Sequence, residues 1–125
     1  MTRQHLKLKI QLYCGDEIAM GPGKADLLDA IRAHGSISAA GRALGMSYRR
    51  AWMLVDVMNR CWRERLVETS PGSAHGGGAR VTLFGETVLR HYRGLQDRIA
   101  GASDCGDHNA LSQVMLPQPR VSQKA

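Results

Sequence analysis

The chain has 125 residues and a mass of 13.7 kDa, which is enough for one small domain. Hydrophobic residues make up 43% and charged residues 22% of the sequence, a composition typical of folded rather than disordered proteins. The apolar runs are too short to cross a membrane, and the first residues lack the continuous apolar segment of a signal peptide. We therefore expect a cytoplasmic protein.

Basic residues are concentrated in the first part of the chain. Lys and Arg number 17 against 11 Asp and Glu, so the formal net charge is +6 and the pI is about 9.7. Residues 102–125 contain two residues of each sign, so residues 1–101 hold the whole positive surplus. A folded domain with that surplus favours a polyanionic partner, most often a nucleic acid.

The first predicted element is a β-hairpin over residues 6–20. Apolar and polar side chains alternate from Leu6 to Tyr13, and Ile18 and Met20 resume the alternation. This period of two predicts half-buried strands. The intervening Gly15-Asp16 predicts the turn.

Three helices are predicted after the hairpin. In residues 24–34 the apolar side chains share one helical face, and Gly35 stands where a C-cap glycine belongs. Ser36 is placed to cap a second helix, with Ile37, Ala40 and Leu44 on one face, that ends at Gly45. Ser47 is placed to cap a third helix, whose buried stripe comprises Ala51, Leu54, Val55, Met58 and Trp62.

Beyond the third helix the pattern changes. Residues 66–70 predict a strand, residues 71–78 are rich in glycine, and residues 79–83 predict a returning strand. A last helix is predicted to begin at Thr82 or Leu83.

One face of this last helix carries apolar residues in steps of four and three, a spacing that suits a partner helix. Because the helix closes the fold at its edge, we expect it to join two subunits into a homodimer. The alternative is that the same face packs on its own domain. The residues of this face are Phe84, Val88, Tyr92, Leu95 and Ile99.

The end of the sequence differs in composition from the rest. Residues 102–125 hold two prolines and no sustained period, so we expect a flexible tail, apart from a weak contact through Leu111–Leu116. Residues 1–101 are expected to form one folded domain.

The order of these elements is that of a winged helix-turn-helix. We therefore predict a mainly α fold with a small amount of β, an N-terminal β-hairpin and a C-terminal dimerisation helix. Small residues at Ala39, Ala40 and Ala43 let the second helix lie close to the third, and Gly45 supplies the sharp turn. Such a motif places the amino end of its second helix in the DNA major groove, which predicts a sequence-specific transcription regulator bound to double-stranded DNA.

The third predicted helix carries the candidate base contacts. With Ala51 at the centre of the buried face, a rotation of about 100° per residue places Arg49 and Met53 on the opposite side and Arg50 at its flank. Each arginine can offer a bidentate fork to guanine or a charge to phosphate, and Met53 is a further candidate base contact. The alternative for the arginine pair is a plain solvated surface.

Candidate backbone contacts surround this helix. Ser47 can bond a phosphate as well as cap the helix, and Ser36 and Ser38 lie at the amino end of the preceding helix. For Tyr48 two roles stay open: packing at the margin of the core, and a contact to phosphate. We expect Trp52 to pack at the margin of the core.

The glycine-rich segment 71–78 predicts the tip of a wing. It lacks the spacing of a nucleotide-binding loop and leads into a strand rather than a helix. His75 and Arg80 are therefore candidate phosphate contacts, or else free surface residues.

No enzymatic arrangement is recognisable, so we predict that the protein is not an enzyme and has no cofactor. The five histidines show no metal-binding spacing, and no metal site is predicted. Cys61 is expected near the buried stripe as a small hydrophobe, whereas Cys14 and Cys105 are expected to be exposed. Three cysteines without a paired motif make a disulfide framework improbable.

Two stretches resemble the N-terminal domain of the ModE family of molybdate-responsive transcriptional regulators. The first is GSISAAGRALGMSYRRAWMLVDVMNR (Gly35–Arg60) and the second is LVETSPGSAHGGGARVTLFGETVL (Leu66–Leu89). The first alone is also similar to the LysR-type motif. The details that favour ModE are Tyr48, Ala51-Trp52, Met58-Asn59 and the triple glycine before the second wing strand.

The resemblance implies a dimeric winged-helix regulator of genes for molybdenum uptake or molybdoenzymes. It also implies that the dimer forms through helices of this domain. The two-fold symmetry of such a dimer predicts a palindromic operator. Full-length members carry molbindin-like domains that bind the oxyanion, and about 24 residues after the last helix leave no room for one. The resemblance therefore does not extend to molybdate binding. Two alternatives stay open: a module that pairs with a longer regulator, and a direct sensor of an oxyanion or metal.

Overall fold

A short antiparallel hairpin begins the fold in the computed structural model, which describes residues 6–71 and 77–124. Strand β1 (Leu12–Cys14) pairs with β2 (Glu17–Met20), and Gly15 in the turn has a φ of +60°, a conformation that favours glycine. The turn is confirmed, but the first strand is shorter than predicted. Residues 6–11 have no strand to pair with.

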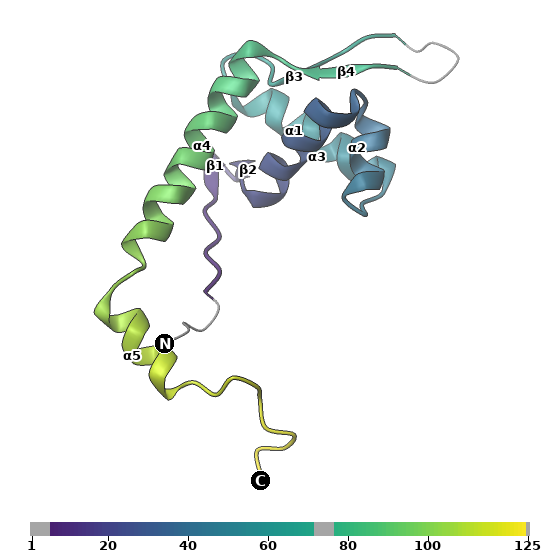
Figure 1. The fold of residues 1–125 in the computed structure, drawn as a ribbon. Helices are drawn as coiled ribbons and strands as arrows, with labels where there is room; N and C mark the ends of the chain where they lie inside the picture. Colours follow the sequence, from purple (N-terminus) through teal and green to yellow (C-terminus); the bar gives the residue numbers. More distant parts are fainter. Residues whose placement is uncertain (1–5, 72–76, 125) are drawn as a thin grey trace.

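Residues 6–11 are held by a helix instead of a strand. The hydroxyl of Tyr92 donates a hydrogen bond of 2.7 Å to the carbonyl oxygen of Ile10. Figure 1 shows this segment running beside the last long helix. The alternating pattern therefore marks an extended segment, which the sequence could not distinguish from a paired strand.

Three helices form the centre of the domain: α1 (Pro22–His34), α2 (Ile37–Ala43) and α3 (Tyr48–Cys61). The predicted caps are confirmed, since Ser36 Oγ accepts from the Ala39 amide and Ser47 Oγ from the Arg50 amide. Gly35 adopts the left-handed conformation with a φ of +73°.

The turn between α2 and α3 is tight. Gly45 has a φ of +69°, and the Met46 amide donates to the Gly41 carbonyl at 2.9 Å. A Cβ at Gly41 would lie 3.1 Å from that of Ala51, so the two helices approach closely. The sequence placed Leu44 on one helical face with Ile37 and Ala40, but α2 ends at Ala43, and Leu44 is exposed as its C-cap.

The core lies where α1, α2 and α3 meet the hairpin and the wing. Ala51, Val55 and Met58 are buried as predicted, and Leu54 and Trp62 are partly buried against them. The other large side chains without exposed surface include Met20, Leu27, Leu28, Ile31 and Leu66. Apolar burial on this scale is the main stabilising contribution to a small domain.

The wing consists of two short antiparallel strands, β3 (Val67–Thr69) and β4 (Ala79–Val81). Both are shorter than predicted. The Ala79 amide donates to the Gly35 carbonyl at 2.8 Å, which ties the wing to the end of α1.

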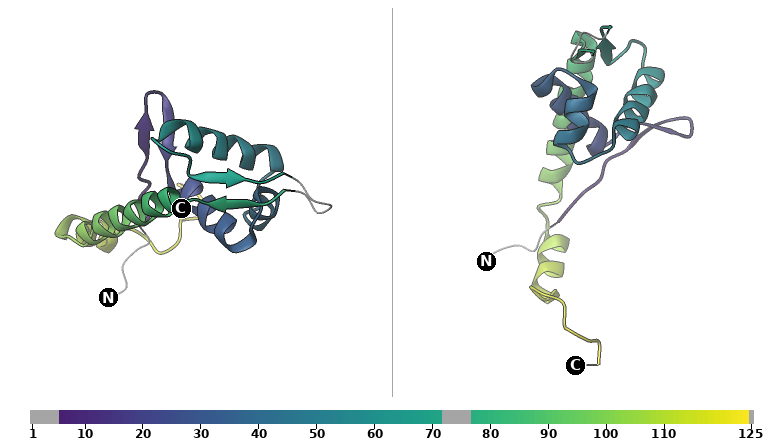
Figure 2. Two further views of the ribbon diagram at one scale, coloured as in Figure 1. Left: turned by 90° about the horizontal axis from the view of Figure 1, so that it is seen from above. Right: turned by 90° about the vertical axis from the view of Figure 1, so that its right-hand side faces the viewer.

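Helix α4 (Leu83–Ala102) begins where the sequence predicted, because Thr82 Oγ1 accepts from the Gly85 amide and caps it. The helix extends beyond the three-helix cluster (Figure 2). A further helix, α5 (Gly106–Val114), lies inside the range predicted as a flexible tail and buries none of its residues. Its nine residues are too few to show a sustained period.

These elements confirm a mainly α winged helix-turn-helix with a small β content. Among the described residues, no helix has the length and apolar character that a membrane span needs.

Candidate nucleic-acid interface

The first two turns of α3 present basic and apolar side chains to solvent. Arg49 and Arg50 are exposed, and 58% of the surface of Met53 is accessible. Ala51 between them is fully buried, so the predicted division of the helix into two faces is confirmed. This placement is what a base-reading helix needs, but it does not by itself test base contact.

Arg49 and Arg50 have no carboxylate partner within the described part of the chain. Arg50 instead lies near another cation, Lys24, whose pKa is lowered chiefly by burial and further by Arg50. A guanidinium that is not paired keeps its full charge and its hydrogen-bond donors for an incoming anion.

Tyr48 and Trp52 form an aromatic pair beside these residues. Their ring centroids are 6.1 Å apart with an interplanar angle of 63°, an edge-on arrangement. Tyr48 is 58% and Trp52 38% exposed. Trp52 is therefore more accessible than its expected place at the margin of the core implied, because its ring lies beside Tyr48 rather than within the apolar cluster.

A cavity of about 280 Å³ separates this aromatic pair from the wing. Ser38 lines it, whereas Ser36, which is partly buried, has its hydroxyl oxygen engaged in the cap of α2. The wing side contributes Thr69 and Ser70, which the sequence analysis missed. Their hydroxyl side chains at the end of a predicted wing strand are the signal by which the sequence could have identified them.

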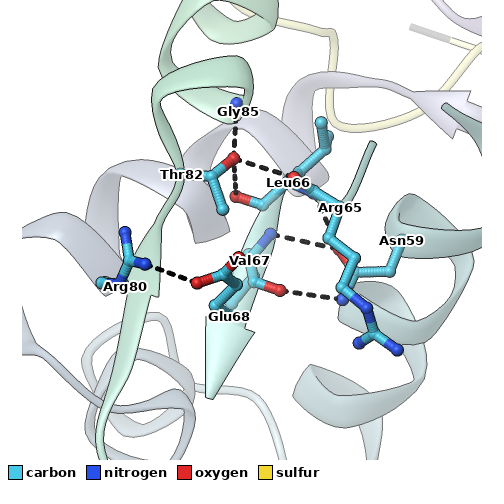
Figure 3. A network of polar contacts seen from close by, with 8 residues as sticks. All are labelled: Asn59, Arg65, Leu66, Val67, Glu68, Arg80, Thr82 and Gly85. Atoms are coloured by element: carbon cyan, nitrogen blue, oxygen red, sulfur yellow. Dashed lines mark hydrogen bonds and ion pairs between the residues drawn. The ribbon is translucent and has the colours of Figure 1, made fainter. Parts of the chain in front are cut away.

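The wing carries two of the predicted phosphate contacts, His75 and Arg80. His75 lies outside the described residues. Arg80 is exposed and forms an ion pair with Glu68, its cross-strand neighbour (Figure 3). Arg80 must therefore exchange this partner, or share it, to bind a phosphate.

The predicted dimerisation face of α4 has a buried part and an exposed part. Tyr92 is only 2% exposed, and Phe84 and Val88 pack against the core of their own domain. Leu95 is half-buried and Ile99 is 37% exposed. Only the carboxyl-terminal end of the face is thus available to a partner. The first half packs on its own domain, which is the alternative that the sequence left open.

Cys14 and Cys61 are neighbours although they are far apart in the sequence. All three cysteines are free, and Cys61 is half-buried while Cys14 and Cys105 are exposed. Burial raises the pKa of Cys61, and a hydrogen bond with Cys14 raises it further. The fold brings the hairpin to the end of α3. Glu17, the cross-strand partner of Cys14, forms an ion pair of 3.7 Å with Arg60, the residue before Cys61.

Within residues 6–71 and 77–124, no group of three or more His, Cys, Asp or Glu side chains is arranged to hold a metal ion.

Curated relatives match most of this chain. The "molybdenum-pterin-binding protein MopA" of Rhodobacter capsulatus is 34% identical over 102 residues, 82% of this chain and 38% of the relative. The "molybdenum transport protein ModE" of Azotobacter vinelandii is 32% identical over 104 residues, 83% of this chain and 38% of the relative. The "DNA-binding transcriptional dual regulator ModE" of Escherichia coli K12 is 34% identical over 87 residues, 70% of this chain and 32% of the relative.

No family model matches the sequence. The chain spans less than two fifths of the length of these relatives. A match of 102 residues within 125 necessarily includes the helix-turn-helix and the wing, the elements that define the fold. By this similarity, the chain belongs to the ModE family as its N-terminal winged helix-turn-helix domain.

Proposed function

We propose that the chain is a sequence-specific DNA-binding regulator of transcription. The observation that carries the proposal is the exposed, uncompensated charge of Arg49 and Arg50 beside Met53 at the amino end of α3. In helix-turn-helix proteins this is the part of the fold that enters the major groove. Several relatives are named as transcriptional regulators, which agrees with this assignment.

The proposed contacts fall into two classes. Arg49 and Arg50 read guanine edges, and Met53 packs against an apolar base edge such as a thymine methyl group. The remaining residues hold the sugar-phosphate backbone and set the register of α3. They are Ser36, Ser38, Ser47, Tyr48, His75 and Arg80.

The proposed assembly is a homodimer on a palindromic operator. Leu95 and Ile99 on α4 provide the contact, together with the exposed Leu6 and Leu8 of the adjacent extended segment. A two-fold dimer of this kind places its half-sites about one or two helical turns apart.

The test is fluorescence anisotropy with DNA from upstream of the chain's own gene and of neighbouring molybdenum-transport genes, with a random duplex as control. We expect binding to an upstream site at least about a thousandfold tighter than to random DNA. Equal and steeply salt-dependent binding to every duplex would contradict the proposal. Parallel titrations with and without molybdate test the alternative of a direct oxyanion sensor, which a molybdate-dependent change in affinity would support.

A further inference from the structure

The side chain of Asn59, near the carboxyl end of α3, reaches across to the first strand of the wing. Its Oδ1 atom accepts hydrogen bonds from the amides of Leu66 and Val67 at 2.9 and 3.1 Å. Its Nδ2 atom donates to the Val67 carbonyl at 3.0 Å. Figure 3 shows the amide facing β3 from the side opposite β4. Asn59 therefore takes the place of a neighbouring strand at that edge of the wing.

The same stretch of backbone is held from its other side by Thr82. The Thr82 amide donates to the Leu66 carbonyl at 2.9 Å, and Thr82 Oγ1 donates to the Arg65 carbonyl at 2.8 Å (Figure 3). The Leu66 and Val67 side chains are buried. The base of the wing is thus fixed between the helix that carries the candidate base contacts and the start of α4.

We propose that Asn59 is a positioning residue that sets the angle of the wing relative to α3. This inference rests on the proposed function, because the angle matters only if both elements touch the same DNA. The base contacts of α3 and the phosphate contacts of the wing lie on one duplex, so their separation must match it. Asparagine suits the task because it offers an acceptor and a donor on one short, rigid arm.

A second attachment keeps the wing folded when the Asn59 contacts are removed. The hydrogen bond from the Ala79 amide to the Gly35 carbonyl joins β4 to α1 and does not involve α3. Loss of the Asn59 side chain should therefore free the orientation of the wing more than it unfolds the domain.

The experiment measures how much flanking DNA contributes to binding. The probe is the duplex that the wild-type chain selects from a random library, prepared in a short form and in a form extended by flanking base pairs. For the wild-type chain, the extension should tighten binding about tenfold through added phosphate contacts. For Asn59→Ala, we expect the short duplex to bind within about threefold of wild type and the gain from the extension to fall below about twofold.

Trp62→Phe is the matched control. It also removes one hydrogen bond from the end of α3 to a backbone carbonyl, the 3.1 Å contact from Trp62 Nε1 to Ala19, but that contact holds the hairpin. This variant should lower the melting temperature while keeping the full gain from flanking DNA. Asn59→Asp keeps both acceptor contacts but turns a carboxylate oxygen instead of a donor toward the Val67 carbonyl, so it should restore only part of the gain. If Asn59→Ala fails to fold, Asn59→Asp provides the test in its place.

Two results would overturn the inference. One is an Asn59 variant that keeps the full gain, and the other is a variant that loses affinity equally on both duplex lengths. A wild-type chain that selects no sequence would refute the proposed function itself, and this result appears before any variant is measured.

Discussion

The arginines of this domain divide into two groups by their partners. Arg93 lies 2.9 Å from Asp26 and 2.7 Å from Asp29, and Arg60 lies 2.9 Å from Asp56. Arg49 and Arg50 have no such partner among the described residues. Exposed ion pairs add little stability, but they neutralise the surfaces on which they lie. The charges of Arg49 and Arg50 are therefore left uncompensated at the amino end of α3.

The two groups should respond differently to truncation. Arg49→Ala should weaken binding to the preferred duplex by about 1–3 kcal/mol and relax the choice of base at one position. Arg80→Ala should weaken binding to all sequences alike, because a phosphate contact carries no base information. Anisotropy titrations with the preferred duplex, its single-base variants and a random duplex separate the two effects. Equal losses of both variants on preferred and random DNA would show that this division of roles is wrong.

Cys61 offers a second test at the residue scale. Burial and the hydrogen bond with Cys14 both raise the pKa of Cys61, so little of the reactive thiolate is present near neutral pH. Alkylation by iodoacetamide at pH 8, followed by mass spectrometry of the peptides, should be slow at Cys61 and should accelerate as the pH rises. Cys14→Ala should speed it, because one cause of the raised pKa is lost.

Cys105→Ala is the control for this measurement, since Cys105 is exposed in the carboxyl-terminal region and should not alter the Cys61 rate. A rate at Cys61 that is unaffected by Cys14→Ala would argue against the contact between the two thiols.

At the scale of elements, the start of α4 is locked against the wing. A Cβ on Gly85 would overlap the carbonyl oxygen of Leu66 and lie 2.8 Å from a methyl group of Val81. Gly85→Ala should therefore push α4 away from the wing and destabilise the domain by about 1–3 kcal/mol, as overpacking does. Urea denaturation followed by circular dichroism measures the change.

Gly94→Ala is the matched control on the same helix. A Cβ at Gly94 meets no atom within 4 Å, so the substitution gains helix propensity without a clash. It should stabilise the domain by about 0.5–1 kcal/mol. If both variants were stabilising, the close approach of α4 to the wing would be refuted.

The parts of the fold that the sequence predicted correctly depend on local chemistry. Ser36 and Ser47 each cap the helix that their position indicated, the last helix begins at Leu83, and Gly35 and Gly45 adopt left-handed conformations at the predicted turns. Such signals involve neighbouring residues only, so one sequence is enough to recognise them.

The parts that were missed depend on contacts between distant residues. Nothing in the alternation of residues 6–11 reveals that Tyr92 will hold them, and nothing in the pattern of α3 reveals that Asn59 will bond to Val67. The exposure of Trp52 was missed for a similar reason, since the wing faces that helix across a cavity. The base contacts, the phosphate contacts and the dimer face stay predictions.

At the scale of the whole molecule, α4 packs on the core through Leu89 and Tyr92, and charged pairs connect it to α1. Arg93 of α4 reaches Asp26 and Asp29 of α1, and Arg32 of α1 lies 3.4 Å from Glu86 of α4. The projecting end of α4 is therefore held at a set angle to the helix-turn-helix (Figure 1). If two copies join through that end, this angle determines the distance between their two α3 helices.

The last prediction concerns this assembly. Ile99→Asp places a charge on the exposed end of the α4 face, where burial against a partner would cost the desolvation of a carboxylate. Sedimentation at micromolar concentration should show the wild-type chain as a dimer and this variant as a monomer. Leu83→Asp is the control, because Leu83 is exposed at the opposite end of α4 and an acidic residue suits the first turn of a helix.

The consequence for DNA binding follows from the linkage of two half-sites. A monomeric Ile99→Asp variant retains its α3 helix and wing, so its affinity for a single half-site should equal that of wild type. Its affinity for the whole palindrome should fall by two or more orders of magnitude, about the gain expected when the second contact becomes intramolecular. A variant that stays dimeric would place the subunit contact elsewhere than at this end of α4. A monomer that binds the palindrome as tightly as wild type would show that joining the two subunits does not contribute to the affinity.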